Sequence, residues 1–193
     1  MNELPVLIVG PAGSGKSAAI RALCGDRLVR RQVVLADGDN GVAIGLETGE
    51  LEIPAAGSLS LLAYPADKSR LLGRFIAPEM HAGVVLLIDG RDEAAIEELR
   101  HYLQQISSAE SLPLAIGVTH LDLGLRKNLD ALALQMTDFG LHCPLFRIDA
   151  RQRGDVGVLL EALLLSMYVA EADGASVDRL TGFTEPLSSG FCS

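Results

Sequence analysis

The sequence predicts an α/β fold in which a mostly parallel sheet is covered by helices on both faces. Short apolar runs, such as 6–9, 84–88 and 114–118, alternate with amphipathic stretches. The run VVLLI at 84–88 has no polar face, so we expect it in a strand that is buried on both sides. The chain has 193 residues and 49% of them are hydrophobic, which suits one domain with a large core.

Strands and helices are expected to alternate along most of the chain, with parallel strands and right-handed crossovers. The helix over 92–106 is supported by an apolar stripe and by acidic residues in its first turns, which the helix dipole favours. We expect strands at 6–9, 59–62, 84–88, 114–118 and 145–148, and helices at 16–24, 69–80, 92–106, 129–136 and 158–168.

The segment 28–57 does not fit this alternation. Its strand character is broken by glycines, and two antiparallel edge strands would fit, the second of them at 59–62. The stretch RRQVVLADGDNG, at 30–41, is rich in turn formers, so we expect it to be mobile. After the last helix the composition changes to Asp, Gly, Ser and Thr, which predicts a domain over 1–171 and a flexible tail over 172–193.

Composition excludes several classes of partner. The formal net charge of −9 argues against nucleic acid or an anionic membrane as the main partner. No apolar stretch is long enough to suggest stable insertion in a membrane. The cysteines are three and have no paired spacing, which favours a reducing, cytoplasmic location without a metal knuckle.

The motif GPAGSGKS directly follows the first predicted strand and opens the first predicted helix. Its glycines allow the backbone to curl so that several N–H groups point inward, Lys16 can reach the β and γ phosphates, and Ser17 can offer its hydroxyl to Mg²⁺. The predicted phosphate-binding residues are Gly10, Pro11, Ala12, Gly13, Ser14, Gly15, Lys16, Ser17 and Ala18, with Ser17 as the metal ligand. Kinases, ATPases and GTPases all use such a loop.

The choice of base depends on the end of a later strand. In GVTHLD, at 117–122, the carboxylate of Asp122 is placed to accept hydrogen bonds from the N1–H and the exocyclic amine of guanine. Adenine offers no such pair of donors, so a carboxylate here would reject it. The run IDAR, at 148–151, ends the last predicted strand.

These motifs resemble those of one family. Thr119, His120 and Asp122 belong to a segment similar to the [N/T]-K-x-D guanine motif of Ras-like small GTPases. Asp149, Ala150 and Arg151 form a segment that resembles the S-A-K loop of that family, in the D-A-R form of bacterial members. The stretches 41–53 and 58–75 are similar to segments of bacterial Ras-like proteins related to the gliding-motility GTPase MglA.

The resemblance implies a Ras-like three-layer P-loop NTPase fold, with a mostly parallel six-stranded sheet and one antiparallel edge strand. It implies binding of GTP and GDP with Mg²⁺, switching between two conformations, and signalling in the cytoplasm. Bacterial relatives act beside Roadblock-type regulators or sensor-kinase systems, so a protein partner of this kind is expected.

Departures from the family pattern concern hydrolysis. The best alignment places Gly41 where family members carry the Thr of the first switch, so that ligand is lost unless Asp37 or Asp39 replaces it. Asp67 stands where the family has the water-positioning Gln, and it puts an anion beside an anionic phosphate. The residues expected to act in catalysis are Lys16 and Asp67, and we expect slow or partner-dependent hydrolysis.

Two other classes of function stay open at this point. The chain could be a P-loop kinase or ATPase that uses Asp89, at the end of VVLLID, as a metal ligand. It could also be a degenerate interaction module that keeps the fold and no longer switches. Arg30 and Arg31 are expected to be solvated surface residues, with an internal arginine finger as the alternative.

Overall fold

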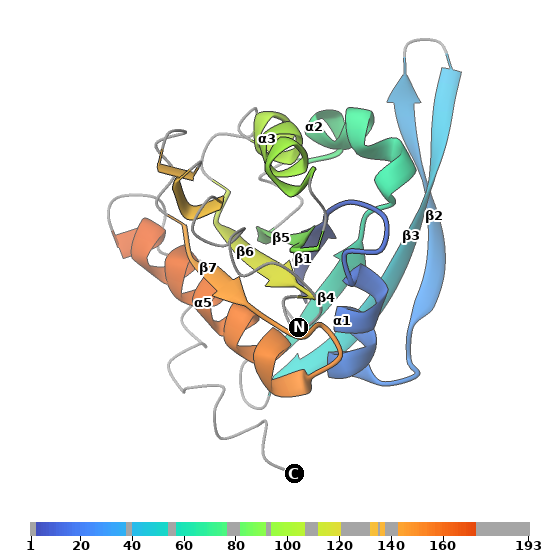
Figure 1. Ribbon diagram of the computed structural model, residues 1–193. Coiled ribbons are helices and arrows are strands. Elements are labelled where there is room, and N and C mark those ends of the chain that lie inside the picture. Colours follow the sequence, from blue (N-terminus) through green and yellow to red (C-terminus); the bar gives the residue numbers. More distant parts are fainter. Residues whose placement is uncertain are drawn as a thin grey trace.

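A computed structural model of the chain shows one central sheet between two layers of helices (Figure 1). The structure describes residues 3–37, 40–53, 57–76, 82–91, 94–106, 112–120, 132–134, 136–137 and 143–172. The strands are β1 (Glu3–Val9), β2 (Val29–Asp37), β3 (Asn40–Ile53), β4 (Gly57–Ala63), β5 (Gly83–Asp89), β6 (Leu114–Thr119) and β7 (Leu145–Arg147). The helices are α1 (Lys16–Cys24), α2 (Leu72–Phe75), α3 (Ala95–Ile106) and α5 (Arg153–Ala172), with a 3₁₀ helix at Ala66–Leu71.

The described strands form a seven-stranded sheet in the order β2-β3-β4-β1-β5-β6-β7. From β4 to β7 all neighbouring strands are parallel, whereas β3 is antiparallel to both β2 and β4. This confirms the predicted α/β fold with a mostly parallel sheet and an antiparallel edge. The sheet has one strand more than expected, because the segment after α1 forms an additional edge strand.

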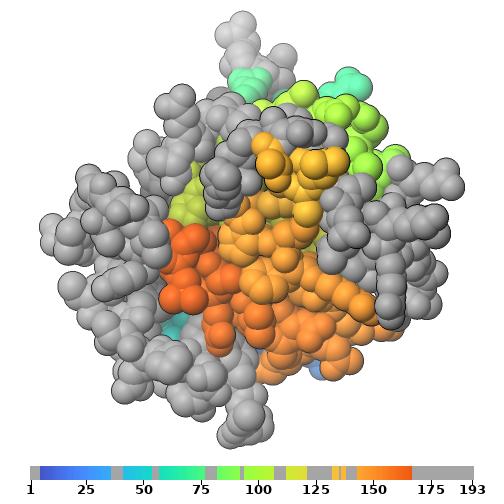
Figure 2. Space-filling model, turned by 60° about the vertical axis from the view of Figure 1, so that its left-hand side comes forward, coloured from blue at the N-terminus to red at the C-terminus, as the bar shows by residue number. Residues whose placement is uncertain are grey.

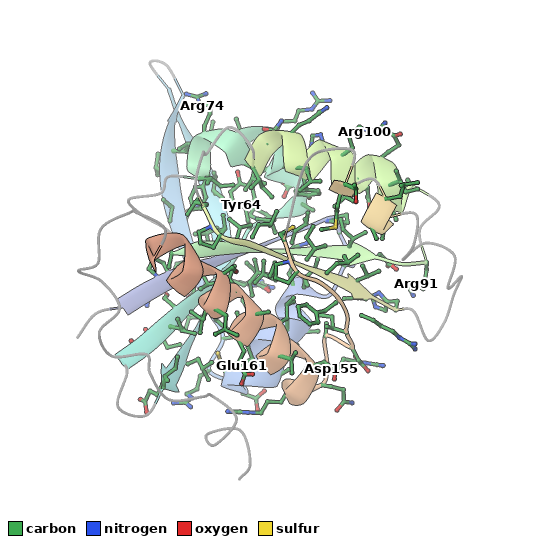
Figure 3. The ribbon with its side chains drawn as sticks, turned by 90° about the vertical axis from the view of Figure 1, so that its left-hand side faces the viewer. Tyr64, Arg74, Arg91, Arg100, Asp155 and Glu161 are labelled. Carbon is green, nitrogen blue, oxygen red and sulfur yellow. The ribbon has the colours of Figure 1, made fainter. Side chains whose placement is uncertain are left out.

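Each face of the sheet has its own hydrophobic core, as expected for strands buried on both sides. Alternate residues of β1 and β5 point to opposite faces: Leu7 and Leu86 pack with α2 and α3, while Ile8 and Leu87 pack with α1 and α5. The two helical layers lie on opposite sides of the sheet in Figure 3, and the outer surface of α5 is in view in Figure 2. None of the described helices is both long and apolar enough to cross a membrane.

The antiparallel part of the sheet corrects two predictions. The stretch 30–41 is not a mobile connection in its described part: 29–37 forms β2, which pairs along its whole length with β3. The segment 59–62 is not an edge strand either, because it belongs to β4 and pairs in parallel with β1 in the interior. The continuous ladder with β3 provides hydrogen-bond partners for the backbone N–H and C=O groups of β2. The stabilisation from this pairing outweighs the tendency of nearby residues to form turns.

The helix predicted at 69–80 is also shorter than expected. The chain forms a 3₁₀ helix at Ala66–Leu71 and one turn of α2, and Ile76 then adopts an extended conformation, with ψ of 120°. Pro78 lies two residues further along the sequence, and a proline has no N–H for the helical hydrogen bond to the carbonyl group of Arg74. Residues 132–134 and 136–137 are helical, within the predicted helix at 129–136 or one residue beyond it, and the tail at 173–193 lies outside the described residues.

A glycine on β3 allows α1 to lie close against the sheet. A Cβ atom added to Gly49 would lie 2.6 Å from Cγ2 of Ile20 and 2.9 Å from Sγ of Cys24. Both of these α1 residues are buried. The approach of α1 to β3 therefore depends on the missing side chain.

Replacing Gly49 by valine is expected to lower the free energy of unfolding by about 1–3 kcal/mol, because the branched side chain overpacks the α1–β3 contact. Urea denaturation with a circular dichroism readout measures this. Gly45, on the same strand, has nothing within 4 Å of an added Cβ, so Gly45→Val is the matched control and should change stability little. Equal losses in both variants would contradict the explanation.

Candidate functional site

The phosphate loop predicted at 10–17 connects β1 to α1, as the motif requires. Gly10, Gly13 and Gly15 have φ angles of 143°, 80° and 99°. Residues other than glycine rarely adopt such positive φ angles. The Nζ atom of Lys16 donates hydrogen bonds to the carbonyl oxygens of Gly10 and Pro11, at 2.8 and 2.6 Å. The ammonium group therefore lies inside the loop, where it could meet a phosphate.

The beginning of α1 carries no anion of its own. Gly15 caps the helix without a side-chain hydrogen bond, and the first turn, which the structure describes in full, contains no acidic residue. The positive end of the helix dipole thus faces the loop without a protein anion from its own turn to neutralise it. Together with Lys16, this arrangement fits a phosphate group.

Thr119 connects the end of β6 to the phosphate loop. Its buried hydroxyl lies 3.1 Å from the carbonyl oxygen of Ser14 and 3.2 Å from that of Ile88. The same hydroxyl lies 3.0 Å from Nδ1 of His120, which follows with a φ of 58°. The start of the predicted guanine motif is therefore fixed against the loop, whereas Asp122 lies outside the described residues.

The predicted DAR loop also reaches the phosphate loop. Ala150 is buried, and a Cβ atom added to Gly15 would lie 2.7 Å from its Cβ. Asp149 accepts hydrogen bonds from the backbone and the guanidinium group of Arg151, which lower the pKa of its carboxyl to about 2. The backbone N–H of Asp149 donates to Asp155 in the first turn of α5, so the loop is tied to that helix.

Asp89 ends β5 beside this group of loops. Its carboxylate accepts hydrogen bonds from the backbone N–H, Nε and Nη2 of Arg91, labelled in Figure 3, and lies 3.3 Å from Nδ1 of His120. Burial alone would raise the pKa of Asp89, but the hydrogen bonds from Arg91 outweigh it and lower the pKa. Because Arg91 engages both carboxylate oxygens, the structure does not favour Asp89 as a metal ligand.

A pocket of about 370 Å³ lies next to the phosphate loop, between α1, β3 and the end of β4. Its lining includes Lys16 and Ser17 from the predicted motif, and the residues that complete it are Arg30, Gly45, Leu46, Glu47, Ala63, Tyr64 and Pro65. Asp67 is not part of this lining: its side chain is 73% exposed and forms an ion pair with Lys68 at 3.7 Å. A catalytic role of Asp67 therefore stays a prediction, and the residue does not line the pocket beside Lys16 and Ser17.

Glu47 connects β3 to α1 at this pocket. The hydroxyl of Ser17 donates a hydrogen bond to Oε2 of Glu47, and Arg30 forms an ion pair with Oε1 at 3.1 Å. The hydrogen bond from Ser17, with those from Arg30, lowers the pKa of Glu47 although burial opposes the shift. The Ser17 hydroxyl and an ionised carboxylate are hard oxygen donors, which is the chemistry that Mg²⁺ prefers.

Burial lowers the pKa of Lys16 to about 8, although the negative charges of Glu47 and Glu98 act in the opposite direction. Within the described part of the chain Lys16 has no ion pair, and a buried lysine loses part of the hydration that stabilises its charge. A phosphate in the loop would restore that stabilisation.

The fold of the chain is similar to that of a solved domain. The G domain of the FeoB iron transporter of T. maritima matches 85% of this chain and 98% of its own, with a TM-score of 0.60 and 15% identical residues. The chain has the fold of a GTPase G domain. No protein-family model matches the sequence, and no curated protein matches it either.

Within this G-domain fold, the structure corrects the position expected for the first-switch ligand. Gly41 pairs with Ala36 near the end of the β2–β3 hairpin, which extends beyond the helical layers in Figure 1. Glu47 follows Gly41 by six positions along an extended strand, a distance of roughly 20 Å. The acidic residue that reaches Ser17 is therefore Glu47 rather than Asp37, which also lies near that end; Asp39 lies outside the described residues.

Sequence reasoning missed Glu47 as a site residue, and it did not bring Arg30 to the phosphate loop. One signal was present: strand alternation puts Glu47 on the same face as Gly49, and a glycine within a strand marks a close approach of another segment. Arg30 is an exposed residue of β2 that reaches Glu47 across the hairpin register, in which the two residues are direct partners.

Proposed function

We propose that this chain binds GTP and GDP together with Mg²⁺ and acts as a bacterial Ras-like signalling protein in the cytoplasm. The observation that carries the proposal is the convergence of three loops. Thr119 of the predicted guanine motif and Ala150 of the predicted DAR loop both contact the phosphate loop. A nucleotide with its phosphates against α1 would place its base on the side where these two loops lie.

Hydrolysis is proposed to be slow or to depend on a partner protein. Catalysis of phosphoryl transfer consists mostly of positioning and charge stabilisation. Asp67 is exposed, and the side chain that reaches Ser17 is the carboxylate of Glu47 rather than the threonine expected in the first switch of the family. A second protein could supply the missing groups, and a Roadblock-type regulator or a sensor-kinase system is the class of partner that the resemblance favours.

Binding of a fluorescent GDP analogue tests the proposal. We expect GDP and GTP to displace the analogue from the Mg²⁺-containing protein, and ADP to compete at least about 100-fold less well, because adenine lacks the donor pair for Asp122. Lys16→Ala should weaken GDP binding on the order of 100-fold through the lost charge-assisted contacts. Asp122→Ala should reduce the preference for guanine over adenine.

The outcomes separate the alternatives. Equal competition by ADP and GDP would favour a kinase or ATPase, and no binding of either would favour a degenerate interaction module. For hydrolysis, single-turnover cleavage of GTP by the purified protein should be very slow. Rapid cleavage without a partner would contradict that part of the proposal.

A further inference from the structure

We propose that Glu47 is a ligand of the nucleotide-bound Mg²⁺, beside Ser17, and that it does so from the β3 strand rather than from a switch loop. The inference rests on the proposed function, because the metal would need phosphate oxygens as additional ligands. Among the described residues no three His, Cys, Asp or Glu side chains are grouped as an independent metal site. Glu47 and Ser17 would therefore hold the cation only together with the nucleotide.

The fold fixes Glu47 in this place. Ser17 and Ile20 lie one helical turn apart on α1, while Glu47 and Gly49 lie two residues apart on the same face of β3. The close contact between Gly49 and Ile20 therefore aligns the next pair, Glu47 and Ser17, at the beginning of the helix. Because β3 is paired on both sides, by β2 and by β4, its backbone cannot easily move Glu47 away.

The two carboxylate oxygens of Glu47 have different partners. Oε2 accepts the hydrogen bond from Ser17, whereas both hydrogen bonds from Arg30 go to Oε1, at 3.1 and 3.3 Å. Arg30 thus holds the carboxylate with Oε2 directed at the hydroxyl.

Glu47 is the only described residue of the pocket lining that offers an anionic oxygen ligand. Among the residues that surround the pocket, Glu47 is the one that carries a carboxylate, and Ala63, Tyr64 and Pro65 line the side of the pocket formed by the end of β4. The cationic groups of Lys16 and Arg30 flank the carboxylate and would offset its charge beside the phosphates. Glu47 is thus the side chain in this lining suited to a magnesium ion that Ser17 also contacts.

Release of a fluorescent GDP analogue, measured as free Mg²⁺ is lowered with EDTA, tests the role of Glu47. We expect Glu47→Gln to raise the Mg²⁺ concentration needed to retain GDP by about 10- to 100-fold, since even indirect partners of a metal contribute that much to affinity. Glu50→Gln is the matched control: Glu50 is an exposed residue of the same strand, pairs with Arg31 at 3.7 Å, and is absent from the pocket lining. It should leave the Mg²⁺ dependence unchanged.

A spectroscopic measurement on the unaltered protein gives independent evidence. With Mn²⁺ in place of Mg²⁺, and ¹³C in the side-chain carboxyl groups of glutamate, electron–nuclear double resonance of the GDP complex should show a ¹³C coupling to the metal. The coupling should be lost in Glu47→Gln and kept in Glu50→Gln.

Each outcome is informative. If the wild-type protein retains GDP with Mg²⁺ but shows no ¹³C coupling, Glu47 is not a ligand. Tighter Mg²⁺ binding by Glu47→Gln would mean that Glu47 blocks Ser17 instead, and would also overturn the inference. If the wild-type protein binds no GDP with Mg²⁺ present, the proposed function itself fails.

Discussion

Replacing Gly10 by alanine is expected to lower the free energy of unfolding by about 2–5 kcal/mol and to abolish nucleotide binding. Gly10 has a φ of 143°, a conformation that L-residues rarely adopt. A Cβ atom added there would lie 2.1 Å from the carbonyl oxygen of Leu87 on β5. The expected loss combines about 1–2 kcal/mol of backbone strain with about 1–3 kcal/mol of overpacking.

Gly13→Ala provides the matched control for this prediction. Gly13 also has a positive φ, of 80°, but an added Cβ would have nothing within 4 Å. The control should therefore lose only the strain contribution, about 1–2 kcal/mol. Urea denaturation of both variants measures the difference, and a fluorescent GDP analogue reports whether the loop still binds. If Gly10→Ala is no less stable than Gly13→Ala, close packing of the loop against β5 is not the reason why position 10 requires glycine.

The central strands could be predicted from the sequence because their signal is local. The run at 84–88 has no polar residue, and all of β5 is buried between two helical layers. The phosphate loop is also local: eight consecutive residues specify its glycines, its lysine and the helix that follows. In such segments the neighbouring residues alone indicate the final environment.

The antiparallel hairpin could not be predicted in the same way, because its stability comes from pairing between separate segments. The stretch 30–41 contains residues that favour turns, yet 29–37 becomes a strand through its ladder with β3. Glu47 was missed for a related reason. Its role depends on how β3 crosses α1, and this crossing is set by the contact of Gly49 with Ile20 rather than by residues adjacent to Glu47.

Nucleotide binding is expected to take up a proton at alkaline pH, because Lys16 has a pKa of about 8 in the nucleotide-free protein. Phosphates in the loop would stabilise the ammonium form and raise this pKa. Below pH 8 Lys16 is already charged, so binding needs no proton and affinity is nearly constant. Above pH 8 the free protein has lost the proton, so uptake approaches one proton per site and affinity falls by up to tenfold per pH unit.

Calorimetric titration with GDP in two buffers of different ionisation enthalpy measures this uptake directly. The titration should be carried out above pH 7.5. The terminal phosphate, with a pKa of about 6, is then fully ionised and does not contribute to the measured proton uptake. Lys16→Arg is the appropriate control, since a guanidinium group does not deprotonate in proteins. Even if this variant binds GDP more weakly, its binding should show no proton uptake at pH 9. Proton uptake that persists in Lys16→Arg would assign the proton to another group. An affinity that does not change from pH 7.5 to 9.5 would show that burial in the loop does not lower the pKa of Lys16.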